Sequence, residues 1–268
     1  MRDVKLAALL SDFACPRPRP LRRQEIAWRQ TTPASRLTIA DGQGCWRERG
    51  ATHEPKALLL HGWGGDASLF GPLADALSAI GWHVIIPDLL GHGDASATSC
   101  GYTAQLQWLN ALECRFGHFD LIVAHSAGAL LVEIARAQGA LMSRARLSLA
   151  GPVTLISLFE CYLSQTLQAG FDAAELAAAY LDDQHLPPSL LVSEPCSSDD
   201  KLLICHGNND EVIPVKDAKR LAARHPHSTL WLPADTGHMG LVQHPELAQR
   251  VARFCPLPEG RTADALDA

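Results

Sequence analysis

The chain has 268 residues, of which 47% are hydrophobic and 19% charged, a composition typical of a globular protein rather than a disordered one. Its formal net charge of −6 at pH 7 argues against nucleic acid as a partner, because nucleic-acid-binding proteins usually present a basic face. No apolar run approaches the length of a membrane-spanning helix, and we expect a cytoplasmic protein. The eight cysteines are scattered and form no CxxC pair, so we expect neither a zinc site nor a disulfide framework.

The first 24 residues are predicted to form an N-terminal arm. Its apolar stretch LAALL is too short for the core of a secretory signal, and Asp12 interrupts it. We expect an amphipathic turn here, followed by an extended Pro/Arg-rich segment. Its arginines at 17, 19, 22 and 23 could bind something acidic, but we expect a solvated arm. Residues 25 to 56 contain short alternating pieces, which indicate a small antiparallel start to a sheet.

Strands and helices then alternate along the chain. Near-continuous apolar runs predict strands at 57–61, 83–88, 120–125, 145–151, 201–207 and 228–233. Amphipathic stretches between them predict helices at 68–80, 103–116, 127–138, 215–225 and 245–255. Alternation with buried strands is typical of an α/β protein with a mostly parallel central sheet covered by helices on both faces.

Residues 152–198 interrupt the alternation and are predicted to form a helical cap or lid insertion over one edge of the sheet. The predicted organisation is therefore an arm at 1–24, a core at 25–151 and 199–256, the cap at 152–198 and a C-terminal tail at 257–268. Apolar residues of the cap recur at helical spacing, and we expect them either to line an acyl pocket or to form an ordinary core-facing stripe. They are Leu155, Leu158, Phe159, Tyr162 and Leu163.

Ser126 lies where a predicted strand meets a predicted helix, in the sequence AHSAG. A turn with no loop between the two elements is tight, and the small residues Ala124 and Gly128 on either side would permit it. Such a turn would expose the hydroxyl above the sheet edge and bring the Ala127 N–H to a helix N-terminus, where it can stabilise negative charge. Ser126 could instead be a simple helix cap.

An acid and a histidine follow two later strands. Asp210 comes three residues after Gly207, with Glu211 as its rival, and His238 follows the last predicted strand, with His244 as its competitor. A serine needs a neighbouring base to become a nucleophile, and the base needs an acid to hold its tautomer. The order Ser126, Asp210, His238, each at the carboxyl end of a strand, predicts a catalytic triad.

From about residue 35 to 256 the sequence resembles the α/β-hydrolase superfamily. The resemblance is carried by HGWGG (61–65), PDLLGHGDA (87–95), AHSAGA, GNNDEVIP and DTGHMG. It implies the α/β-hydrolase fold, an oxyanion hole formed by the Trp63 and Ala127 N–H groups, and structural roles for Asp88 and His92. Two motifs depart from the usual pattern: Ala124 replaces the first glycine of G-x-S-x-G, and Asp94 and Ala95 replace the last two positions of D-x-x-G-H-G-x-S.

These observations predict a serine hydrolase that cleaves carboxylic esters through an acyl-enzyme intermediate, like a small carboxylesterase. LLLHGWGG is also similar to the opening of carboxylesterases that act on carrier-bound methyl esters in biotin synthesis. We expect a small-molecule ester or thioester as substrate, with no metal or organic cofactor. The alternatives are a thioesterase acting on carrier-bound acyl chains and a non-catalytic ligand-binding protein on the same fold.

Overall fold

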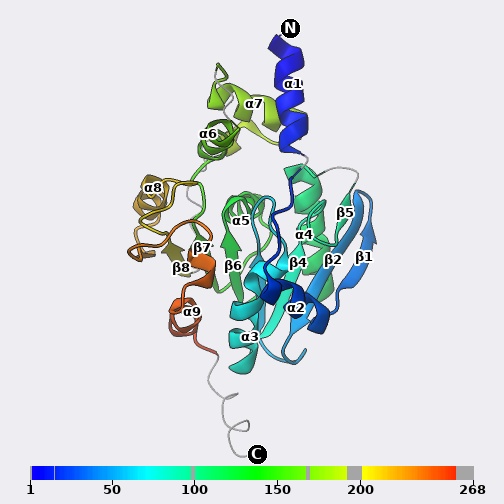
Figure 1. Ribbon diagram of the computed structural model, residues 1–268, viewed down its shortest axis with the longest axis vertical. Helices are drawn as coiled ribbons and strands as arrows, with labels where there is room; N and C mark the ends of the chain where they lie inside the picture. Colours follow the sequence, from blue (N-terminus) through cyan, green and yellow to red (C-terminus); the bar gives the residue numbers. More distant parts are fainter. Residues whose placement is uncertain (1, 15, 98–99, 167–169, 192–200, 258–268) are drawn as a thin grey trace, which may run out of the picture.

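A single twisted sheet forms the centre of the molecule in the computed structural model, which describes residues 2–14, 16–97, 100–166, 170–191 and 201–257 (Figure 1). Within these ranges the strand order is β1-β2-β4-β3-β6-β7-β8-β9, and β5 pairs separately with β2. The pairs β1·β2, β2·β4 and β2·β5 are antiparallel, and every later pair along the sheet is parallel. The strands are β1 Ser35–Ile39, β2 Gly42–Arg49, β3 Lys56–Leu60, β4 His83–Asp88, β5 Ser96–Ala97, β6 Leu121–His125, β7 Ala145–Leu149, β8 Lys201–Cys205 and β9 Thr229–Trp231.

The six strands that the alternation predicts are all present, as β3, β4, β6, β7, β8 and β9. The mostly parallel sheet and its antiparallel start are therefore confirmed. Strands β4, β6 and β7 are buried along their whole length, as expected where helices cover both faces of a parallel sheet.

Helices pack on both faces of the sheet. The apolar core on one face includes side chains of α4 (Tyr102–Phe116) and α5 (Ala127–Ala137), and α8 (Lys216–Arg224) packs against β8 on this side. The core on the other face includes side chains of α3 (Gly71–Ala79) and α9 (Leu247–Phe254). Short 3-10 turns at Ala67–Phe70 and Leu241–Gln243 precede α3 and α9. Side chains that alternate along each strand divide between the two cores, as the two-residue period of a strand requires.

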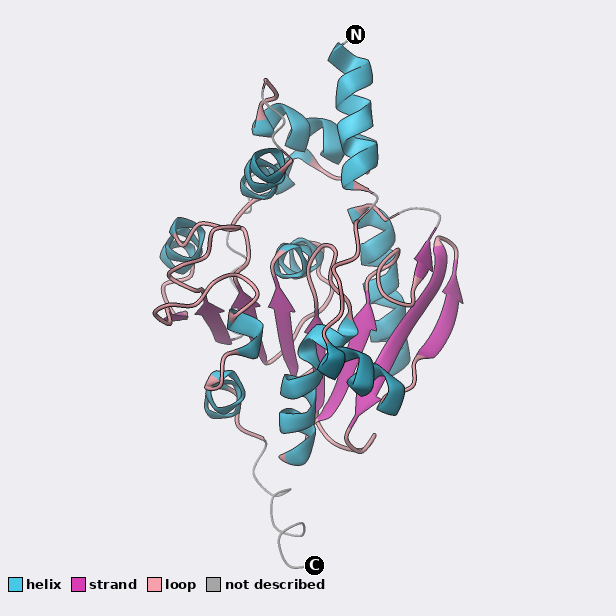
Figure 2. Cartoon of the chain, viewed as in Figure 1, coloured by secondary structure: helices cyan, strands magenta, loops and turns pink. Residues whose placement is uncertain are grey.

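Two helices of the predicted cap, α6 (Leu155–Gln165) and α7 (Ala173–Asp183), stand beyond the carboxyl ends of the central strands (Figure 2). They pack against each other and are followed by a 3-10 turn at Pro188–Leu191. Capping fixes where both helices begin: the Thr154 hydroxyl accepts the Ser157 N–H at 3.0 Å, and the Asp172 carboxylate accepts two N–H groups at the start of α7. The division of the chain into arm, core, cap and tail stays a prediction, and residues 192–198 of the cap and 258–268 of the tail lie outside the described residues.

The N-terminal arm differs from its prediction. It forms two helices (Figure 1). The first, α1 (Arg2–Phe13), has three turns and lies beside α6 and α7 beyond the carboxyl ends of the strands. The second, α2 (Arg23–Thr31), is shorter. Arg17 is exposed as expected, but Arg19 keeps only 20% of its side-chain surface and pairs with Glu25 and Asp66. The expectation of a solvated arm was wrong at Arg19, because its guanidinium pairs with two carboxylates, Glu25 and Asp66, that follow it in the chain.

Candidate active site

Ser126 occupies a sharp turn between β6 and α5. Its backbone has φ 54° and ψ −129°, a conformation that costs energy for a residue with a side chain. The turn also brings backbones very close together. A Cβ atom on Gly128 would lie 2.3 Å from the His61 carbonyl oxygen, and one on Gly62 would lie 2.7 Å from the Ser126 Cβ. Glycine at 62 and 128 is therefore what allows the serine to sit at this joint.

His238 and Asp210 lie in hydrogen-bond reach of Ser126 and of each other. The His238 Nε2 is 3.0 Å from the Ser126 Oγ, and its Nδ1 is 2.8 Å from the Asp210 Oδ2. Because an ionised carboxylate only accepts hydrogen bonds, Asp210 favours the tautomer with the proton on Nδ1, which leaves Nε2 free to accept the serine proton. The sequence-predicted serine, acid and histidine are thus brought together in one line of hydrogen bonds.

The loop after β8 holds Asp210 firmly. Its Oδ1 accepts the backbone N–H groups of Val212 and Ile213 at 2.9 and 2.8 Å, which leaves Oδ2 for His238. His206, at the end of β8, lies 3.4 Å from the same Oδ2 and donates to the Ile213 carbonyl oxygen at 2.8 Å. Burial lowers the pKa of His206, so this ring stays neutral and serves as a brace for the loop.

The two rival residues lie elsewhere. Glu211 is exposed, next to Asp210 but outside its hydrogen bonds with Val212 and Ile213. His244 packs its ring edge-on against Trp231, and its Nδ1 accepts the Glu246 N–H at 3.2 Å just before α9. Neither residue lines the cavity beside Ser126.

His125, the residue before Ser126, contacts His238. The two rings lie 4.6 Å apart, and the His125 Nε2 donates to the His238 carbonyl oxygen at 3.2 Å. Burial, reinforced by the neighbouring His238, holds the pKa of His125 well below its ordinary value. The sequence offered no signal for this contact, because it depends on how the loop after β9 folds back over β6.

Two backbone segments face the serine where an oxyanion hole would form. Ala127 is the first residue of α5, so its N–H has no partner within the helix. Trp63 lies in the glycine-rich loop after β3, and Gly62, Trp63 and Ala127 line the same cavity as Ser126. We name residues 62–66 the oxyanion loop. The Trp63 and Ala127 N–H groups therefore stay the candidates that the sequence indicated.

The cavity beside Ser126 has a volume of about 330 Å³. Of the five cap residues expected in a pocket, Leu158 and Tyr162 line this cavity. Phe159 does not: it is fully buried and its ring faces Phe13 and Tyr180. Cys161 also lines the cavity, but burial raises the pKa of its thiol to about 12, so it is not a second nucleophile at neutral pH.

A buried polar network fixes the loop that follows β4. The Asp88 carboxylate accepts the N–H groups of Ala67 at 2.6 Å and Asp94 at 2.9 Å, which ties this loop to the residue that follows the oxyanion loop. His61 contributes its Nε2 as the acceptor for the Leu89 N–H at 3.0 Å, and burial lowers the pKa of its ring. Asp88 and His61 therefore hold backbone in place around the site.

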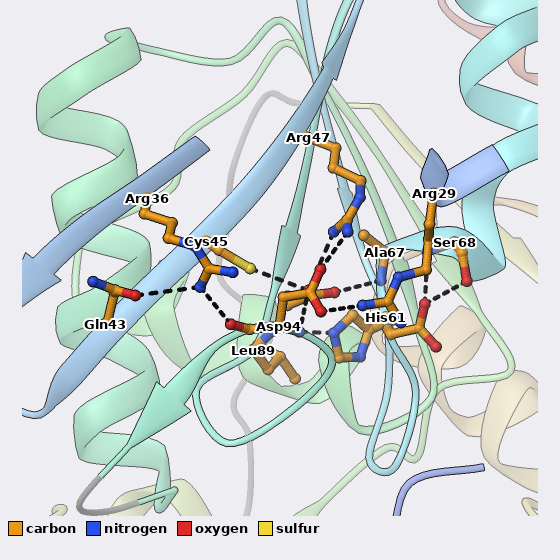
Figure 3. A network of polar contacts seen from close by, with 12 residues as sticks. Arg29, Arg36, Gln43, Cys45, Arg47, His61, Ala67, Ser68, Leu89 and Asp94 are labelled. Carbon is orange, nitrogen blue, oxygen red and sulfur yellow. Dashed lines mark hydrogen bonds and ion pairs between the residues drawn. The ribbon is translucent and has the colours of Figure 1, made fainter. Parts of the chain in front are cut away.

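Asp94, in the second of the two motifs that depart from the family pattern, joins this network through two guanidinium groups. Figure 3 shows its carboxylate between Arg47 and Arg29. Burial alone would raise the pKa of Asp94, but the hydrogen bonds from Arg47 and Arg29 outweigh it and lower the pKa. The Asp94 carbonyl oxygen also accepts from Arg36 at 2.8 Å (Figure 3). Asp94 thus links the loop after β4 to α2, β1 and β2.

Within the described ranges, no group of three or more His, Cys, Asp or Glu side chains is arranged to hold a metal ion. In the same part of the chain, no helix combines the length and the apolar character needed to cross a bilayer.

Comparisons with known proteins agree on the fold. Residues 58–138 match the sequence model of the family described as alpha/beta hydrolase fold. Lipase 1 of Psychrobacter immobilis is 40% identical over 73 residues, a segment that covers 26% of this chain and only 22% of that lipase. The esterase RhEst1 from Rhodococcus sp. ECU1013 superposes with a TM-score of 0.64 at 18% identity, covering 85% of this chain and 99% of that one. A thioesterase domain from the curacin biosynthetic pathway superposes with a TM-score of 0.61 at 15% identity, covering 84% of this chain and 98% of that one. Together these matches show that the chain has the α/β-hydrolase fold.

Proposed function

We propose that the protein is a serine hydrolase that cleaves carboxylic esters through an acyl-enzyme intermediate. The observation that carries the proposal is the pair of distances on either side of one imidazole, 3.0 Å to the Ser126 Oγ and 2.8 Å to the Asp210 Oδ2. A serine hydroxyl becomes a nucleophile when a base takes its proton, and a base serves best when an acid fixes its orientation. The similarity to a lipase and to an esterase supports the choice of ester substrates.

In the proposed first half-reaction, the Ser126 Oγ attacks the ester carbonyl carbon while His238 Nε2 accepts the hydroxyl proton. The carbonyl oxygen becomes an oxyanion, which the Trp63 and Ala127 N–H groups stabilise by donated hydrogen bonds. Collapse of the tetrahedral intermediate breaks the bond to the alcohol oxygen. His238 gives its proton to that oxygen, and the alcohol leaves an acyl group on Ser126.

In the second half-reaction, water replaces the alcohol. His238 accepts a proton from the water as its oxygen attacks the acyl carbon, and the same two N–H groups hold the second oxyanion. The bond to Ser126 then breaks, the proton returns to the Ser126 Oγ, and a carboxylic acid is released. Asp210 stays ionised throughout and stabilises the imidazolium that forms twice in each cycle.

Labelling and substrate panels test this proposal together. A fluorophosphonate should label Ser126, and Ser126→Ala should lose both the label and ester turnover, by roughly four to six orders of magnitude in kcat. Ser164→Ala, which changes an exposed serine of α6, is the matched control and should keep both. If Ser126→Ala hydrolyses esters at the wild-type rate, the proposal is wrong.

The same machinery would serve a thioester, because attack at the carbonyl carbon and the oxyanion are common to both substrates. A panel of esters and thioesters with matched acyl groups therefore decides between the two. A higher kcat/KM for the esters supports the proposal, and a higher kcat/KM for thioesters would make the protein a thioesterase. If Ser126 reacts with neither substrate and takes no label, a ligand-binding role is favoured.

A further inference from the structure

The N-terminal helix α1 packs onto the cap directly above the candidate active site. The Tyr162 hydroxyl of α6 donates to the Asp12 carboxylate at 2.8 Å, and α1 also contacts α7. Phe13, the last residue of α1, is 98% buried although it lies close to the N-terminus. Because Phe13 is buried and α1 is held against the cap, the Phe13 side chain has a fixed position above the candidate active site.

Phe13 is surrounded by four aromatic rings from three other segments. Its ring stacks on Trp63 of the oxyanion loop, with centroids 4.9 Å apart and planes 7° from parallel. It also contacts Phe159 and Tyr162 of α6, at 4.8 and 5.3 Å, and Tyr180 of α7 at 5.4 Å. Offset and edge-on contacts of this kind are favourable geometries for aromatic rings. They fix the position of the Phe13 ring from several sides.

Two cavities meet at this ring. The first is the cavity of about 330 Å³ beside Ser126, and the second, of about 980 Å³, lies between α1 and α6. Six residues line both of them and form the partition between the two spaces: Phe13, Arg17, Trp63, Gly64, Tyr162 and Gln165. The three aromatic side chains among them are in contact with one another through Phe13. We propose that Phe13 is a specificity-determining residue, which limits the length of the apolar chain that a substrate can carry. This proposal rests on the function proposed above.

The cavity beside Ser126 suits a short apolar chain. Its volume is at the low end of the roughly 300–1,000 Å³ common for ligand pockets. Apolar side chains from both the core and the cap line it: Leu69, Leu158, Val212, Ile213 and Met239. A chain that outgrows this space meets the partition, in which Phe13 is the buried apolar side chain. Removing the Phe13 ring would connect the two cavities and give a longer chain room to extend.

Phe13 is the member of the partition that can be removed most cleanly. The Trp63 backbone is a candidate oxyanion donor, and the Tyr162 hydroxyl is bonded to Asp12. Phe13 has no polar side-chain atom, so its truncation leaves no hydrogen bond unmade. Phe159 offers a matched control. Like Phe13 it contacts the rings of Tyr162 and Tyr180, but it lines neither of the two cavities.

The experiment compares the rates at which butyl and dodecyl fluorophosphonates label Ser126, followed by mass spectrometry on the intact protein. Wild type should react faster with the butyl probe. Phe13→Ala should raise the dodecyl-to-butyl ratio by about tenfold or more, since each methylene accepted by an apolar pocket is worth about that factor. Phe159→Ala should lower the melting temperature without changing the ratio.

The outcomes separate this inference from the proposed function. If neither probe labels Ser126 in wild type, the proposed function fails and this inference fails with it. If Ser126 is labelled but the ratio is unchanged in Phe13→Ala, or rises equally in Phe159→Ala, only the role of Phe13 is overturned. Phe13→Leu keeps an apolar side chain in the partition and should raise the ratio by a smaller amount. It replaces Phe13→Ala in the comparison if circular dichroism shows that the alanine variant does not fold.

Discussion

The ring of His125 rests against the ring of His238, 4.6 Å away, and its Nε2 donates to the His238 backbone at 3.2 Å. This contact ties the loop that carries the proposed base to the strand that ends at the proposed nucleophile. The precision of the Ser126–His238 hydrogen bond therefore depends on a residue that has no proposed part in proton transfer. His125 is a positioning residue in this scheme.

His125→Leu should lower kcat for ester hydrolysis about 10- to 100-fold, because small displacements of reacting groups cost rate steeply. His125→Gln retains an N–H donor and should recover part of the loss, which a purely space-filling role would not predict. The comparison is made by steady-state kinetics with circular dichroism as the folding check. His118→Leu, at an exposed histidine, should behave as wild type.

Asp210→Asn should reduce kcat by roughly four orders of magnitude, because an amide in place of the carboxylate would favour the wrong histidine tautomer. Glu211→Gln should stay within a few-fold of wild type, since that side chain is exposed. The two variants change the same chemistry at neighbouring positions, so kinetic measurements on both decide which acid matters. A large loss in Glu211→Gln with a small one in Asp210→Asn would reverse the assignment.

Arg19→Met should both destabilise the fold and slow the reaction. The Arg19 backbone donates to the Gly64 carbonyl oxygen at 3.1 Å, and its guanidinium pairs with Glu25 at 2.8 Å and Asp66 at 3.4 Å. Its loss leaves two buried carboxylates without a cation, which typically costs roughly 3–5 kcal/mol. We expect a lower melting temperature and a lower kcat, because Gly64 and Asp66 belong to the oxyanion loop. Arg23→Met, at an exposed arginine, is the control and should change neither.

Stability should fall as the pH drops below about 6.5, where unfolded histidines take up protons. Burial lowers the pKa of His61, His125 and His206, and burial together with the nearby His61 lowers that of His92 to about 3. Within this pH range the unfolded chain binds more protons than the folded one, so unfolding becomes easier as protons are added. Each such histidine contributes up to about 1.4 kcal/mol per pH unit.

Urea denaturation between about pH 7 and about pH 5 measures this dependence. His92→Gln removes one of the four groups and should make the free energy of unfolding less steep in pH by up to about 1.4 kcal/mol per unit. The test compares how steeply the free energy of unfolding changes with pH, so the stability of the His92→Gln variant at neutral pH does not affect it. An unchanged slope would show that His92 takes up its proton in the folded state as readily as in the unfolded one.

The sheet and the three aligned residues could be predicted because they follow from local patterns. Apolar runs mark buried strands, and parallel strands bring their carboxyl ends to one edge. Residues in the turns and loops that follow such strands, as Ser126, Asp210 and His238 are, are therefore candidates to meet. Their catalytic roles stay predictions, but their proximity needed no knowledge of distant packing.

The remaining parts of the site depend on contacts between segments far apart in the chain. Helical spacing marked an apolar stripe on α6, but it could not tell that Leu158 would face the cavity while Phe159 faced the core. The partners of Phe13 and Arg19 lie up to 167 residues away, as the contact of Phe13 with Tyr180 illustrates. Periodicity within one element carries no information on which other element will cover it.

The stacking of Phe13 on Trp63 places a side chain of α1 in the wall of the pocket beside the oxyanion loop. The sheet and the helices on its faces supply the scaffold, whereas one wall of the pocket comes from a helix that precedes the first strand. Substitutions in α1 could therefore alter which molecules the pocket accepts while every strand register is kept. For a laboratory that wishes to redirect the protein to new compounds, α1 is the segment to randomise first, with the β-strands left unchanged.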